Sequence, residues 1–294
     1  DRFNIIRNNK MKYWLIIGVV VTLVSCDTED DKPGTSEVEI VENNAPKVVV
    51  DSAGIDFEAD REIIDEKTIE RGVKIKWYEH GEGEKIKSGD MVNIDYKVYL
   101  ENGEVIDGNH LIKAESLPFM VGFQMQTESW DNALKELRAG DFAEVLIPAS
   151  EMRGDKEIEG VVPKNSNNIL KIRILSFNEP TKIIDGTRIW LMNENEANIN
   201  YFNESNRISF HCWASSPSNP RYFNTEWKNN PYSFGLGDGG LVPGLRKALI
   251  NAKKADLMFV HVPAKEAFGA KGYQDLVKPN EDLLYRVFVM DVTK

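Results

Sequence analysis

Strict alternation of apolar and polar side chains marks two strands in the first half of the chain. Apolar residues recur at every second position over 73–77 and again over 92–100, the period of a strand with one buried face. The turn Glu101-Asn102-Gly103 follows the second run, and Asn-Gly supplies the positive φ angles that tight hairpins need. We therefore expect two half-buried strands, the second of which enters a hairpin.

The spacing becomes helical over 129–137, where apolar residues recur every three or four positions. Gly140 follows and is expected to close this helix as its C-terminal cap. Apolar runs over 142–147 and 169–175 predict two more strands, and three isoleucines among charges over 59–72 predict a short leading helix. Many strands and one central helix indicate an α+β fold with an antiparallel sheet.

A whole domain is repeated in the sequence. The stretch from Phe119 to Gly154 recurs from Phe234 to Gly269, an offset of 115 residues that holds without a gap to at least Ile174. Such a period is too long for a solenoid repeat and suits a complete small domain. We expect one domain over residues 57–178 and a second over residues 183–294.

The order and spacing of these residues resembles a known family, the FKBP-type peptidyl-prolyl cis-trans isomerases. The resemblance covers roughly two thirds of the chain. It implies that each domain is a curved antiparallel β-sheet wrapped on one short α-helix. The first copy carries the family pattern at Phe119-Met-Val-Gly, Trp130, Gly140-Asp141, Val145-Leu-Ile-Pro148, Glu151, Gly154 and Val161-Val-Pro-Lys-Asn165.

The reaction implied by the resemblance is rotation about an X–Pro peptide bond, whose barrier of ~18–20 kcal/mol comes from amide resonance. No atom has to be attacked or protonated. An apolar cup catalyses the rotation by binding the twisted imide better than either planar form and by excluding water. The implied site therefore consists of aromatic and aliphatic side chains with one or two hydrogen bonds, and it needs no cofactor.

In the first copy the resemblance implies that Tyr96, Asp107 and Trp130 are the catalytic residues, with Trp130 as the floor of the cup. The alternatives are that Trp130 is a core tryptophan on an amphipathic helix and that Asp107 is a turn residue. Several positions depart from the family pattern. Ile106, Leu117 and Leu170 replace phenylalanines, and Arg153 stands where a tyrosine is usual. The expected substrate contacts are Ile106, Leu117, Phe119, Gln126, Thr127, Val162 and Leu170.

The second copy departs at the polar positions and at the floor. Leu245 replaces the tryptophan, while Asn224 and Cys212 are expected at the positions of the aspartate and the tyrosine. Its cup is thus more apolar and lacks the polar pair. The expected substrate contacts are Phe223, Tyr232, Phe234, Leu241, Val242, Leu245, Phe268, Val277 and Tyr285.

The N-terminal residues predict export and lipidation. Residues 1–10 read as an upstream extension before Met11, and an apolar run then leads to Leu23-Val-Ser-Cys26. This resembles a bacterial lipobox and implies that residues 1–26 are removed or modified, with Cys26 carrying the lipid. The alternative is a buried N-terminal helix with an incidental cysteine.

Residues 27–56 are acidic and poor in apolar side chains, so we expect a flexible tether. The acidic residues directly behind Cys26 resemble the export signal of surface lipoproteins in Bacteroidota, and an ordinary solvated charge run explains them equally well. The expected location is the cell envelope, at the outer membrane, on its periplasmic or surface face.

Charge and composition narrow the partners. The chain has 47 acidic and 36 basic residues, a formal charge of −11, which argues against nucleic acid. The four histidines show no metal-ligand spacing, so no metal site is expected. Only Cys212 remains once Cys26 is lipidated, which excludes an internal disulfide in the mature chain.

Three functions remain open on these grounds. The first is a lipid-anchored isomerase that helps exported, proline-containing polypeptides to fold. The second is a catalytically weak scaffold that grips a partner in an outer-membrane or secretion assembly. The third is a surface protein that binds glycans or peptides through the loop 214–231, which is rich in Ser, Pro and Asn.

Overall fold

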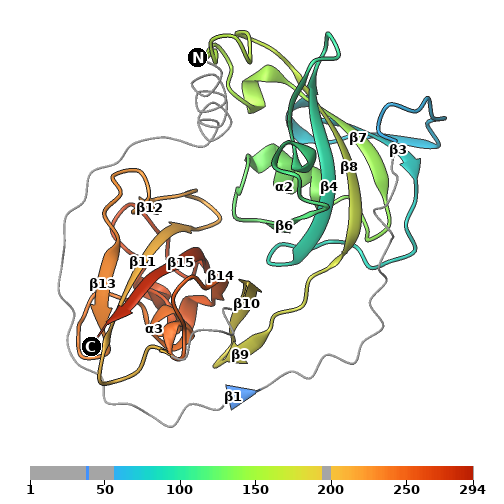
Figure 1. The fold of residues 1–294 in the computed structure, drawn as a ribbon. Coiled ribbons are helices and arrows are strands. Elements are labelled where there is room, and N and C mark those ends of the chain that lie inside the picture. The colour runs from blue at the N-terminus through green and yellow to red at the C-terminus, as the bar shows by residue number, and fades with distance from the viewer. Residues whose placement is uncertain (1–37, 40–55, 194–199, 294) are drawn as a thin grey trace. The chain divides into compact units, whose positions relative to one another are not determined.

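The computed structural model describes residues 38–39, 56–193 and 200–293 (Figure 1). These residues form two compact units, and the division between them in the sequence falls between Asn178 and Glu179. We call 56–178 the first domain, and 38–39 together with 179–293 the second domain. The predicted signal segment, Cys26 and most of the predicted tether lie outside the described residues. No helix in the described part of the chain is long and apolar enough to cross a membrane.

The first domain is a seven-stranded antiparallel sheet with the order β2-β3-β7-β8-β4-β5, and β6 also pairs with β4. The helix α2 packs on one face of this curved sheet (Figure 1). The elements are β2 (Asp65–Thr68), β3 (Lys74–Glu79), β4 (Met91–Leu100), β5 (Val105–Gly108), β6 (Leu117–Met120), α2 (Glu128–Leu134), β7 (Phe142–Ile147) and β8 (Asn168–Phe177).

The second domain repeats this plan in an eight-stranded sheet with the order β1-β9-β10-β14-β15-β11-β12, and β13 also pairs with β11. The elements are β1 (Val38–Glu39), β9 (Lys182–Ile184), β10 (Thr187–Asn193), β11 (Arg207–Ser215), β12 (Phe223–Asn224), β13 (Tyr232–Gly235), α3 (Pro243–Leu249), β14 (Leu257–Val262) and β15 (Leu283–Thr293). The strand β1 lies within the predicted tether and pairs with β9, so that segment is not wholly without structure.

The sequence offset of 115 residues carries over to the elements. Shifted by this offset, β6, α2 and β7 coincide in both bounds with β13, α3 and β14. The strand β8 coincides at its start with β15, and the short 3-10 turn Ala149–Glu151 with Ala264–Glu266. The predicted α+β fold of two repeated domains is therefore confirmed.

The start of α2 follows from local sequence. Thr127 has extended backbone angles and its hydroxyl accepts a hydrogen bond from the backbone N–H of Trp130, as an N-terminal cap does. Trp130, Ala133 and Leu134 are then buried on one face against the sheet. The second helix uses a different device, because Pro243 occupies its first turn and needs no hydrogen-bond partner there.

Three local predictions were wrong. Residues 59–72 form no α-helix; they contain β2 and a 3-10 turn at Glu70–Gly72, and Ile63 and Ile64 are exposed instead of packed. Gly140 does not cap α2, which ends at Leu134. Its φ of +94° instead lets the chain pass Gly81, where a Cβ on Gly140 would lie 2.9 Å from the Gly81 Cα. In the hairpin after β4, only Gly103 has positive φ.

Candidate active site

The polar pair of the first domain is formed by two neighbouring strands. Tyr96 lies on β4 and Asp107 on β5, and the Tyr96 hydroxyl donates to Asp107 Oδ2 at 3.3 Å. The backbone N–H of Gly108 donates to Asp107 Oδ1 at 2.8 Å. Burial raises the pKa of the Asp107 carboxyl, although both hydrogen bonds oppose the shift, and burial also raises the pKa of Tyr96.

Trp130 lies between two aromatic rings. The ring of Tyr96 meets it edge to face at 5.5 Å and 85°, and the ring of Phe119 stacks on it at 5.8 Å and 22°. The indole Nε1 is buried and has no hydrogen-bond partner in the described part of the structure. The three residues assigned as catalytic from the sequence thus lie in one cluster, with the polar pair directly beside the indole.

The structure places most of the predicted substrate contacts in the same cluster. Ile106, Val162 and Leu170 are buried in it, and Leu117 packs against it while remaining half-buried. Gln126 and Thr127 are half-buried at the start of α2. Since the Thr127 hydroxyl caps that helix, its first role is structural.

The cluster is nearly closed to solvent. Trp130 is only 2% exposed, too little for a prolyl ring to pack flat on the indole without some displacement of neighbouring side chains. The half-buried side chains that pack against the cluster include Met125 and Met152, and the Met152 sulfur lies 3.8 Å from the Thr127 hydroxyl. Unbranched methionine side chains adapt readily to a changing surface, so they suit a rim that must move.

Sequence reasoning missed two polar residues that shape the site. Asn109 is buried, accepts from the backbone N–H of Tyr96 at 2.8 Å and donates to the carbonyl of Ala114 at 2.9 Å, so it ties the loop after β5 to β4. Asp131 accepts from the backbone N–H of Gln124 at 2.8 Å and holds the loop before α2. Burial raises the pKa of Asp131 to about 6. The position of Asn109 directly after Asp-Gly at the end of a strand is a signal that the sequence does contain. No sequence signal marks Asp131.

The strand register corrects one assignment in the second domain. Cys212 pairs with Val287, and Tyr96 pairs with Ile172. Ile172 and Val287 are matching residues of the two domains, 115 residues apart, so Cys212 does occupy the tyrosine position. Phe223 pairs with Ala214 as Asp107 pairs with Val98, which places Phe223, not Asn224, at the aspartate position.

A second contact supports this register. Thr225 Oγ1 accepts from the Cys212 N–H at 2.9 Å, the same bond that Asn109 makes to Tyr96 in the first domain. The second domain therefore has a sulfur and a phenyl ring in place of the hydroxyl–carboxylate pair, and burial raises the pKa of the Cys212 thiol.

The other predicted contacts of the second domain gather in one apolar cluster with Leu245. Phe234, Val242, Val277 and Tyr285 are buried, whereas Phe223, Tyr232, Leu241 and Phe268 are half-buried at its edge. Phe268 also stacks on Tyr273 at 4.7 Å. This cluster offers several half-buried aromatic side chains but no carboxylate or tryptophan.

The loop 214–231 of the second domain is held by hydrogen bonds. The hydroxyls of Ser216 and Ser218 both donate to Glu281 Oε2, at 2.7 and 2.9 Å, and the Asn219 side chain donates to the Leu276 carbonyl at 3.0 Å. This part of the loop is thereby fixed to the segment before β15.

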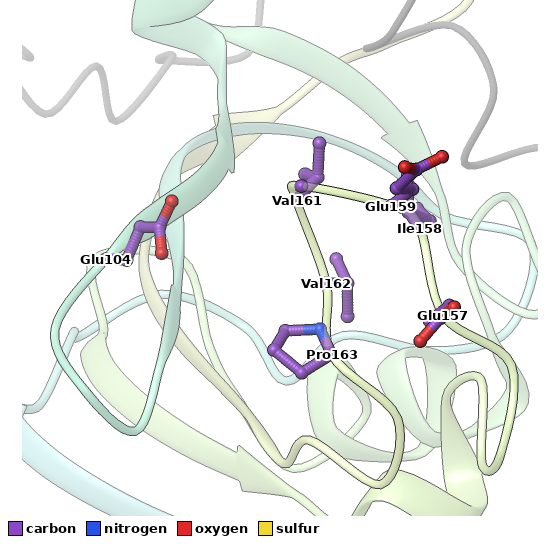
Figure 2. Close-up of a pocket in the computed structure, with 8 residues that line it drawn as sticks. Glu104, Glu157, Ile158, Glu159, Val161, Val162 and Pro163 are labelled. Carbon is purple, nitrogen blue, oxygen red and sulfur yellow. The ribbon is translucent and has the colours of Figure 1, made fainter.

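A hollow of about 360 Å³ opens beside the first cluster (Figure 2). Glu104, at the tip of the β4–β5 hairpin, lies on one side, and the segment Glu157–Glu159 lies on the other. Val162 and Pro163 lie between them, and Val162 belongs to the Trp130 cluster as well. Among the described residues, no group of three or more His, Cys, Asp or Glu is arranged to hold a metal ion.

Comparison with known proteins identifies the family. The family model described as FKBP-type peptidyl-prolyl cis-trans isomerase matches residues 82–175 and 201–290. FK506-binding protein 1 of Candida glabrata is 31% identical over 113 residues, which are 38% of this chain and 98% of that protein. The human peptidyl-prolyl cis-trans isomerase FKBP10 is 19% identical over 206 residues, 70% of this chain and 35% of that protein.

Two solved structures are also similar to this chain. The three FKBP domains of wheat FKBP73 align with a TM-score of 0.35 and 21% identity, covering 76% of this chain and 95% of that one. FkpA from Escherichia coli aligns with a TM-score of 0.33 and 22% identity, covering 37% and 48%.

The segments matched by the family model make up more than half of the chain, so the chain belongs to the FKBP-type peptidyl-prolyl cis-trans isomerases and carries two such domains in tandem. It is therefore an enzyme of X–Pro bond isomerisation, and the family in general binds proline-containing peptides.

Proposed function

We propose that this protein is a lipid-anchored folding factor of the cell envelope, in which the first domain isomerises X–Pro bonds of exported polypeptides and the second domain binds them. The observation that carries the division of labour is the polar pair. Tyr96 and Asp107 meet at 3.3 Å beside Trp130, whereas Cys212, Phe223 and Leu245 occupy the matching positions of the second domain.

The first domain supplies both elements that the reaction needs. The aromatic faces of Trp130 and Phe119 bind the prolyl ring in an environment that excludes water, which favours the twisted imide because its charge separation is smaller. The Tyr96–Asp107 pair orients the peptide by hydrogen bonding. Uncatalysed X–Pro isomerisation takes ~10–100 s and limits the folding of many proteins, so such a catalyst is useful wherever exported chains fold.

The second domain keeps the apolar half of the site. Its half-buried aromatic residues provide contact area for a prolyl ring or another apolar side chain, but nothing there replaces the carboxylate. Binding both forms of the substrate equally well does not accelerate the reaction. We infer that this domain raises the local concentration of the client near the first domain.

The envelope location rests on the apolar run and on Leu23-Val-Ser-Cys26. Anchoring through Cys26 follows from that motif, attachment to the outer membrane from the acidic residues directly behind it, and the tether from the composition of residues 27–56. The second candidate function is a scaffold with little catalysis that binds a partner in an outer-membrane or secretion assembly. The nearly closed Trp130 cluster favours it, because a closed cup slows turnover.

A refolding experiment separates the two functions. A denatured secreted protein whose slow refolding phase is limited by one cis-prolyl bond is refolded with the soluble chain, with its Asp107→Asn variant, or with neither. The folding factor accelerates the slow phase, and the variant accelerates it less at equal binding. A wild-type chain that binds the client without changing the slow phase would establish the scaffold function instead.

A further inference from the structure

The hollow beside the Trp130 cluster has an apolar floor and an acidic rim. Ile158, Val161, Val162 and Pro163 supply the floor, and the side chains of Glu104, Glu157 and Glu159 line the rim and are exposed (Figure 2). These three carboxylates have no hydrogen bond or ion pair to any side chain in the described part of the chain. Lys156 and Lys164 belong to the same loop, but neither lines the hollow.

The glutamates are not needed to form the loop. In the first domain Ile158 and Val162 form a bridge, with N–H···O distances of 2.8 and 2.9 Å. Tyr273 and Val277 form the same bridge in the second domain, at 2.8 and 3.1 Å. At the positions of Glu157 and Glu159, however, that domain carries Gly272 and Gln274. The bridge therefore forms without carboxylates at these two positions, and the one acidic residue of the second loop, Asp275, stands at the position of Gly160.

Both walls of the hollow lead into the site. Glu104 is followed by β5, which reaches Asp107 three residues later. The other wall ends at Val162, which packs in the Trp130 cluster. At ~3.3–3.6 Å per extended residue, a peptide with its proline on this cluster reaches the hollow within about three residues.

We propose that this hollow is a specificity subsite of the first domain that takes a lysine or arginine side chain of the substrate, close in sequence to the isomerised proline. The inference rests on the proposed function of the first domain. A long basic side chain lays its aliphatic stem on apolar surface and keeps its charge in water, which matches an apolar floor below a rim of carboxylates. The second domain has Gly272 and Gln274 at these two positions and a single aspartate, Asp275, beside them, so we expect a weaker preference there.

The test uses X–Pro peptides in which one position within three residues of the proline, on either side, is Lys, Gln or Glu. At one of these positions we expect Lys to raise kcat/KM about twofold to fivefold over Gln at low salt, which is the size of an exposed ion pair. Glu at the same position lowers kcat/KM. The preference shrinks at high salt because the charges are solvent-exposed. The preference for Lys over Gln is lost in the triple variant that combines Glu104→Gln, Glu157→Gln and Glu159→Gln.

Asp155→Asn is the matched control, because Asp155 is an exposed acid of the same loop that does not line the hollow. This variant keeps the preference. Equal kcat/KM for Lys and Gln at every position, or a preference that survives in the triple variant, would overturn the proposal. If no peptide is isomerised at all, the proposed catalytic function is wrong, and calorimetric binding of the Lys and Gln peptides then tests the subsite by itself. Tighter binding of the Lys peptide by the wild type, but not by the triple variant, supports the subsite. Equal binding of the two peptides refutes it.

Discussion

Replacing Trp130 by leucine tests the floor of the site directly, because it recreates what the second domain has at Leu245. The change removes the ring contacts to Tyr96 and Phe119, each worth ~0.5–1.5 kcal/mol beyond area burial. Truncating a buried tryptophan to alanine costs ~3–5 kcal/mol, and leucine restores part of that volume. We expect a loss of about 2–4 kcal/mol of unfolding free energy, which leaves a domain of ordinary stability folded.

The catalytic loss is separate from this destabilisation. Each methylene of the prolyl ring that loses its contact with the indole costs up to ~0.8 kcal/mol of transition-state binding. Loss of contact for one to three methylenes therefore costs about 1–2 kcal/mol, which lowers kcat/KM about 5- to 30-fold. The assay is isomerisation of a short X–Pro peptide, with urea denaturation of the same samples. Trp77→Leu is the matched control: Trp77 is buried in the same domain, but its indole donates to Asp141 and its ring pairs with His80.

Trp77→Leu should therefore lose stability but keep kcat/KM. A folded Trp130→Leu variant with unchanged kcat/KM would show that the indole does not contact the prolyl ring in the transition state.

Three further predictions follow from single residues. The folded pKa of Asp131 is about 6 against an ordinary 3.8, so its contribution to stability is fully present below pH ~4 and is lost as pH rises through 6. Relative to Asp131→Asn, urea denaturation should show the free energy of unfolding falling by about 2 kcal/mol from pH 4 to 7, and parallel curves would contradict this. Gly154 and Gly269 both have φ +58°. Valine at either should cost roughly 1–2 kcal/mol and lower one calorimetric transition only, whereas a fall in both transitions would argue against independent domains. Cys26→Ser should move the protein from the membrane to the soluble envelope fraction, and a variant that still sediments with membranes would refute lipidation.

The sequence predicts the elements best where their signals are local. The helical spacing over 129–137 and the alternation over 92–100 depend on neighbouring residues, and the structure has α2 and β4 there. The predicted helix over 59–72 failed because pairing of β2 with β3 satisfies its backbone, which no local pattern reveals. The repeat predicted the second domain well only from Phe119 onward, where the offset is constant.

Upstream of that point, the same reasoning placed Asn224 one residue out of register. From Tyr96 to Asp107 the register places the counterparts 116 residues later, at Cys212 and Phe223, and the offset is 115 only from Leu117 and Tyr232 onward. The connection from β12 to β13 is one residue shorter than that from β5 to β6, so one ungapped offset does not apply to the whole domain. A slip of one residue moves a side chain to the other face of a sheet, which is why Phe223 and not Asn224 occupies the aspartate position. Burial was equally hidden, since composition alone gives no sign that Trp130 is almost completely enclosed.

The most direct measurement is the isomerisation rate of a short X–Pro peptide as a function of the concentration of the soluble chain, with Asp107→Asn and Leu245→Trp variants alongside. We expect a rate that rises linearly with wild-type concentration, rises less steeply with Asp107→Asn, and rises more steeply with Leu245→Trp, which rebuilds the floor of the second domain. A wild-type rate that stays at its uncatalysed value at every concentration would contradict the account and leave the binding scaffold in its place.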